Sequence, residues 1–171
     1  NLKKMKKIFA VILLFVSLNV FAQNNIEEDI ASKPAITAIG KPDGEKTEMK
    51  IGKEGGSFTS SDGKIRLIIP EGAVSKKTTF SIQPTANLMP NGNGKAYDME
   101  PSGTTFNKPL QLMYYYTDDD TEGNSPLLMG LAMQDENGKW FSLNKTVLDS
   151  LAKTLTADIR HFSAYVNFSK A

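Results

Sequence analysis

Apolar and polar residues alternate along most of the chain beyond residue 50, and this period of two is typical of β-strands with one buried face. The alternation is clearest in residues 65–69, 78–83, 110–116 and 155–159. Glycine, proline and asparagine separate these runs, and Asp62-Gly63 predicts a tight hairpin turn. The pattern predicts an all-β fold, an antiparallel β-sandwich of about eight or nine short strands.

Three further stretches complete this pattern. Residues 127–133 are almost continuously apolar, which predicts a strand covered on both faces. The apolar residues at even positions from Phe162 to Phe168 predict one inward-facing row on a closing strand. Only residues 146–153 have a spacing that indicates a helix, and that helix would be short.

The residues before the alternating region are polar and carry no long periodic run. Lys-Pro pairs at Pro34 and Pro42, and an Asp43-Gly44 dipeptide, interrupt regular structure there. We therefore predict a linker or disordered tail over residues 23–50. One folded β-sandwich domain is predicted over residues 51–171.

The first 22 residues have the composition of a targeting segment. Four lysines precede an apolar run from Ile8 to Val16, and Ala22 supplies a small residue for cleavage. This order predicts a secretory signal peptide over residues 1–22, cleaved before Gln23, and Met5 is the expected start. The apolar run is shorter than the roughly 20 residues that a bilayer span needs. We therefore expect an exported protein, periplasmic or extracellular, with no stable membrane span after cleavage.

Charge and composition exclude several classes of function. Without the leader's four lysines the chain has 16 basic and 19 acidic residues, or about three net negative charges. No nucleic-acid partner is expected of such a chain. The absence of cysteine excludes a disulfide framework and a lipid anchor at cysteine, and one histidine cannot supply a multi-histidine metal centre. We expect no cofactor and no metal.

Three segments, taken in order, resemble the ZU5 domain. They are GGSFTSSDGKIRLIIPEGAVSKKTTFSI at 55–82, AYDMEPSGTTFNKPLQLMYYY at 96–116 and HFSAYV at 161–166. ZU5 domains occur in ankyrins, netrin receptors, zonula occludens proteins and many bacterial secreted proteins. The resemblance covers about residues 50–169. It implies a β-sandwich that mediates protein–protein contacts, with a protein partner that the sequence does not identify.

The resemblance also implies an alternative function at His161-Phe162-Ser163. In a death-domain protein with ZU5 domains, a matching tripeptide is the site of self-cleavage between Phe and Ser. Carried over, Ser163 would attack the Phe162 carbonyl and His161 would assist proton transfer, so that an ester forms and is then hydrolysed. The structural alternative is a regular strand start, with His161 and Ser163 hydrogen-bonded on its outer face.

Two weaker patterns suggest ligands. The acidic residues 118–124 are rich in oxygen ligands and suggest a surface calcium site, but the position where such a loop needs a glutamate is Met129, and a solvated loop is the favoured interpretation. Tyr115 and Trp140 are candidates for a sugar-stacking surface, with Tyr115 expected to face outward. No phosphate loop or Ser-His-Asp order is present. The sequence thus favours a non-catalytic binding module, with self-cleavage and carbohydrate binding as the alternatives.

Overall fold

The computed structural model describes residues 36–121, 123 and 125–169. The predicted signal peptide lies outside these residues. The described part contains eleven strands and two short 3-10 helices. They are β1 (Thr47–Ile51), β2 (Gly56–Thr59), β3 (Ile65–Ile69), β4 (Thr78–Thr85), β5 (Gly92–Glu100), β6 (Thr105–Tyr115), η1 (Asp119–Thr121), η2 (Pro126–Leu128), β7 (Met129–Gln134), β8 (Trp140–Ser142), β9 (Val147–Asp149), β10 (Thr154–His161) and β11 (Ala164–Ser169).

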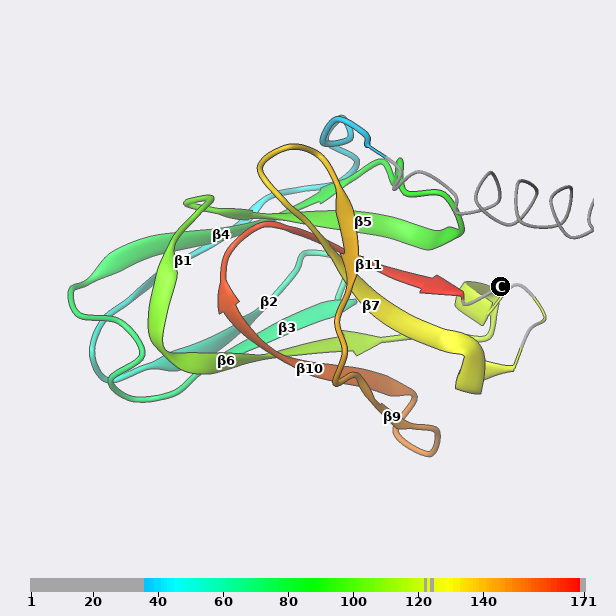
Figure 1. Ribbon diagram of the computed structural model, residues 1–171. Coiled ribbons are helices and arrows are strands. Elements are labelled where there is room, and N and C mark those ends of the chain that lie inside the picture. Colours follow the sequence, from blue (N-terminus) through cyan, green and yellow to red (C-terminus); the bar gives the residue numbers. More distant parts are fainter. Residues whose placement is uncertain (1–35, 122, 124, 170–171) are drawn as a thin grey trace, which may run out of the picture. The chain divides into compact units, whose positions relative to one another are not determined.

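The strands form two antiparallel sheets that pack as a sandwich (Figure 1). The six-stranded sheet has the order β1-β4-β5-β11-β7-β8, and the five-stranded sheet has the order β2-β3-β6-β10-β9. This confirms the predicted antiparallel β-sandwich. The predicted strand number was too low because three strands, the central strand β5 and the short edge strands β1 and β9, were not recognised in the sequence.

The core lies between the inner faces of the two sheets. Each alternating run contributes its apolar residues to this core, as the period of two predicted. The fully buried members from these runs are Ile65, Leu67, Ile69, Phe80, Ile82, Leu110, Leu112, Tyr114 and Leu155. Residues on the opposite faces of these strands are more exposed at positions such as Arg66 and Gln111, while Ile68 and Met113 are half-buried.

Two predictions of local structure were wrong at the sheet edges. Residues 146–153 form no helix, because Val147–Asp149 pairs with β10 as strand β9 and the next residues form a turn. The Asp149 carboxylate accepts hydrogen bonds from the Leu151 and Ala152 N–H groups and fixes that turn. The predicted linker ends too late, because β1 begins at Thr47 and pairs with β4.

The closing strand β11 also differs from its prediction. Phe162 is in the main core, but Val166 and Phe168 face the opposite side of the sheet. There they form a small second cluster with Ala132 of β7. Tyr165 takes the inward position instead, because the chain changes sheets between Phe162 and Ala164 and its alternation is not continuous across that change.

Residues 129–132 are buried on both faces of β7, as the continuous apolar run predicted. The run begins outside the strand, however, because Leu127 lies in η2 and is exposed.

The Asp62-Gly63 turn is longer than the predicted two-residue hairpin, since the N–H of Ser60 donates to the Ile65 carbonyl. Within the described residues, no helix has the length and apolar content needed to cross a bilayer.

Candidate functional site

The His161-Phe162-Ser163 tripeptide lies where the chain passes from one sheet to the other. β10 ends at His161 and β11 begins at Ala164, so Phe162 and Ser163 form the crossover. A cavity of about 730 Å³ lies beside it. Four segments line this cavity, namely the crossover, the Ser102-Gly103 turn, residues 133–138 and residues 37–39.

Backbone hydrogen bonds hold the crossover from several sides. The Phe162 N–H donates to the Thr104 carbonyl at 2.9 Å, and the Gly103 N–H donates to the Phe162 carbonyl at 3.2 Å. The Ser163 carbonyl accepts from the Met99 N–H at 3.1 Å. The peptide bond between Phe162 and Ser163 is therefore fixed in place. The Gly103 N–H also polarises the Phe162 carbonyl in the direction that nucleophilic attack requires, which is the one feature here that favours self-cleavage.

The hydroxyl of Ser163 is not paired with a base. Its Oγ donates to the main-chain carbonyl of Gln134, which is too weak a base to accept the proton. The His161 imidazole is half-buried at the end of β10, and in the described residues it makes no hydrogen bond to Ser163. The His161 carbonyl accepts the Tyr165 hydroxyl at 2.6 Å. In this geometry the tripeptide serves as a hydrogen-bonded connection between the sheets.

We expect the wild-type chain and Ser163→Ala to remain uncut, because no base contacts the serine hydroxyl. Intact mass under denaturing conditions tests this, since strand pairing would otherwise retain a released peptide. The two masses should differ only by one oxygen atom. A fragment that begins at Ser163 in the wild type, and is absent from Ser163→Ala, would contradict the expectation and establish self-cleavage.

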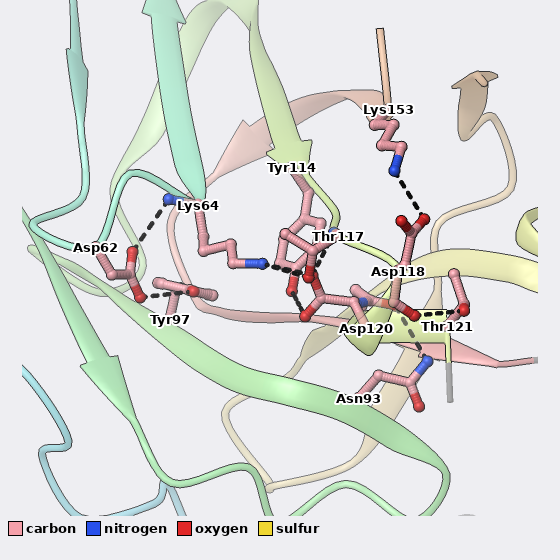
Figure 2. A network of polar contacts seen from close by, with 11 residues as sticks. Asp62, Lys64, Asn93, Tyr97, Tyr114, Thr117, Asp118, Asp120, Thr121 and Lys153 are labelled. Carbon is pink, nitrogen blue, oxygen red and sulfur yellow. Dashed lines mark hydrogen bonds and ion pairs between the residues drawn. The ribbon is translucent and has the colours of Figure 1, made fainter. Parts of the chain in front are cut away.

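The acidic segment after β6 directs its carboxylates to different partners. Asp120 is buried and accepts hydrogen bonds from Lys64 Nζ at 2.5 Å, the Thr117 N–H at 2.6 Å and the Tyr114 hydroxyl at 3.2 Å (Figure 2). Asp118 is exposed and pairs with Lys153 at 2.7 Å. Two carboxylates of the suggested calcium site thus already neutralise ammonium groups. In the part of the chain that the structure describes, no three acidic or histidine side chains are grouped as metal ligands would be.

Burial and hydrogen bonding act in opposite directions on Asp120. Burial alone would raise the pKa of this carboxyl group. The hydrogen bonds from Lys64 and Thr117 outweigh that effect and hold its pKa below the usual range. Asp120 is therefore a buried carboxylate that stays ionised because of its partners.

The same network continues to the other sheet through two tyrosines. The Tyr97 hydroxyl donates to Asp62 at 2.9 Å, and Tyr97 and Tyr114 pack edge to face with their ring centroids 6.3 Å apart. Burial raises the pKa of both phenols, so both remain protonated hydrogen-bond donors. Since Tyr97 is on β5 and Tyr114 is on β6, the network joins the two sheets at one end of the core (Figure 2).

The two aromatic candidates for sugar stacking lie on different sheets. Tyr115 is half-buried on the outer face of the five-stranded sheet, where it was expected to face outward. Trp140 is on β8 of the six-stranded sheet, packs against the second cluster and donates its indole N–H to Thr37 Oγ1 at 2.9 Å. The structure does not bring Tyr115 and Trp140 onto one platform.

A second surface feature was not predicted from the sequence. A groove of about 470 Å³ lies between β10 and the connection from β8 to β9. Leu143, Lys145 and Val147 line one side, and residues 156–158 line the other. The apolar Val147 was a sequence indication of this groove, but the prediction of a helix over residues 146–153 assigned Val147 to a helix and not to strand β9.

No protein-family model matches the chain, and a search of curated proteins gives no match either.

Proposed function

We propose that this chain is a non-catalytic binding module that makes protein–protein contacts outside the cytoplasm. The observation that supports it best is the open edge of β10. β9 pairs only with Thr154–Thr156 of this strand. On the side away from β6, residues 157–160 have no strand partner within the described chain. Alternate residues of an antiparallel strand direct both N–H and C=O to that side, which is a template for one more strand.

The groove beside this edge gives such a strand a place for its side chains. An extended peptide bound along residues 157–160 would continue the line of β9 and make main-chain hydrogen bonds with β10. Every second side chain would then enter the groove and contact Val147, which is 65% exposed. Lys145 and Asp158 place opposite charges at its two walls, which would orient a peptide.

The sequence supports the same proposal. The resemblance to ZU5 domains implies protein–protein contacts, and the predicted leader implies export. The alternatives have less support in the geometry. Self-cleavage needs a base at Ser163, and sugar stacking through two rings needs Tyr115 and Trp140 on one surface.

Replacing Val147 with aspartate should weaken binding of extended peptides about tenfold or more, because it removes an apolar contact from the groove. The probe is a randomised linear peptide library displayed on phage and selected on the immobilised full chain. Enriched peptides are then titrated against both proteins by calorimetry. Amide chemical shifts should move in residues 154–160, where the added strand would bind.

Leu151→Asp is the matched control for this experiment. Leu151 is 98% exposed at the turn after β9 and does not line the groove, so this variant should bind as the wild type does. The proposal fails if no peptide is enriched, or if Val147→Asp and Leu151→Asp bind equally well.

A further inference from the structure

The strand β1 is an edge strand with exposed residues at its centre. It pairs with β4 along one side, and no strand in the described residues pairs with its other side. Glu48, Met49 and Lys50 are all exposed. This edge lies at the opposite end of the strand order from β8 in the same sheet.

The two faces of β1 carry different chemistry. Ile51 is buried in the core, so Met49 shares the inward face with it, while Glu48 and Lys50 lie on the outer face. Met49 is opposite Phe80 of β4 and yet remains 39% exposed. An apolar side chain is therefore incompletely covered at the edge of the sandwich, with one charge of each sign beside it.

We propose that β1 pairs antiparallel with β1 of a second copy of this chain. A twofold axis at Met49 places Glu48 opposite Lys50 of the second copy, and the symmetry repeats that ion pair. The two Met49 side chains then cover each other on the inward face. The contact joins the two six-stranded sheets into one continuous sheet.

The charges of β1 favour this register over its neighbours. A shift by one residue would set inward side chains against outward ones. A symmetric shift of the axis by one position along the strand would place Glu48 against Glu48, or Lys50 against Lys50, where like charges repel. Among the symmetric pairings, the one centred on Met49 alone matches opposite charges and apolar side chains together.

This arrangement has a consequence for binding. A twofold axis that relates antiparallel strands is perpendicular to their sheet, so both copies present equivalent faces on the same side. The two β10 edges of the dimer could then bind one partner at the same time, and that combined binding would be tighter than the binding of one edge alone. This consequence rests on the proposed function, whereas the pairing of β1 does not.

Charge reversal tests the pairing by sedimentation analysis of the full chain from about 1 μM to about 1 mM, the range in which weak contacts form. The wild type should approach twice the monomer mass. Lys50→Glu and Glu48→Lys should each remain monomeric, because each sets like charges opposite one another. The double variant, with the two charges exchanged, should regain the dimer. Lys108→Glu changes an exposed lysine on β6 of the five-stranded sheet and should dimerise normally.

A cysteine scan gives a second, independent readout. The chain contains no cysteine, so one introduced thiol can pair only with its copy. Directly opposite strand residues have Cα atoms about 5 Å apart, within the range that a disulfide spans. Met49→Cys should form a covalent dimer under mild oxidation, and Val147→Cys should not. A wild type that stays monomeric throughout, or dimers that survive both charge reversals, would overturn the proposal whatever the peptide experiment shows.

Discussion

Replacing Phe162 with alanine is expected to lower the free energy of unfolding by about 3 to 5 kcal/mol. The side chain is 1% exposed and packs edge to face with Phe80 and Phe106, at centroid distances of 5.2 and 4.9 Å. These two rings come from β4 and β6, one strand of each sheet. Truncation would therefore leave a cavity at the point where the crossover is anchored to both layers.

Urea denaturation of the wild type and Phe162→Ala measures this loss. Phe141→Ala is the matched control, since that ring is 41% exposed on β8 and should lose less than about 1 kcal/mol. Phe162→Leu should lie between the two, because it keeps most of the buried apolar volume. A loss below about 1 kcal/mol for Phe162→Ala would show that the crossover is not held by this ring.

The period of two was sufficient to predict the fold class and most of the core. It succeeded where a strand is buried on one face, as in β6, where Leu110, Leu112 and Tyr114 all point inward. Hydrophobic alternation reports which face is buried, and a sandwich has one such face on each sheet. Such regular strands make the fold predictable from their own residues.

The predictions failed where tertiary pairing, and not local pattern, determines the structure. β1 carries two charges and one methionine at its centre, and β9 is three residues long. β9 is too short to show alternation, and the alternation of β1 spans only five residues at the end of a polar segment. Each pairs with a longer neighbour that supplies its hydrogen bonds. The groove beside β10 was missed for the same reason.

The crossover shows a different limit. Phe162 and Val166 are four residues apart, which is the spacing of one strand face. Phe162 nevertheless lies in the main core, whereas Val166 lies in the second cluster. The alternation of apolar residues cannot reveal that the chain leaves one sheet and enters the other between two of those residues. The tripeptide at 161–163 was therefore identified as a candidate from its residues, but its role as a connection became visible only in the structure.

Replacing Lys64 with methionine should destabilise the fold by about 2 to 3 kcal/mol at neutral pH. Breaking a fully buried ion pair from one side costs about 3 to 5 kcal/mol, and the loss is smaller here because the Lys64 side chain is 27% exposed. The substitution keeps the apolar stem but leaves the Asp120 carboxylate buried without its cation. Lys153→Met is the control, because its partner Asp118 is exposed and that exposed pair should contribute little.

The pH dependence of this loss identifies its cause. In the wild type the pKa of Asp120 is depressed, so its contribution to stability is present above the unfolded value of about 4 and is lost as the pH falls through the folded pKa. In Lys64→Met, burial without the ammonium group should raise that pKa, and the carboxyl group takes up a proton in mild acid. The difference in stability between the two proteins should therefore be largest at pH 7 and shrink as the pH falls. Denaturation midpoints measured across that range test this, and a difference independent of pH would mean that lost packing, not the unpaired carboxylate, accounts for the effect.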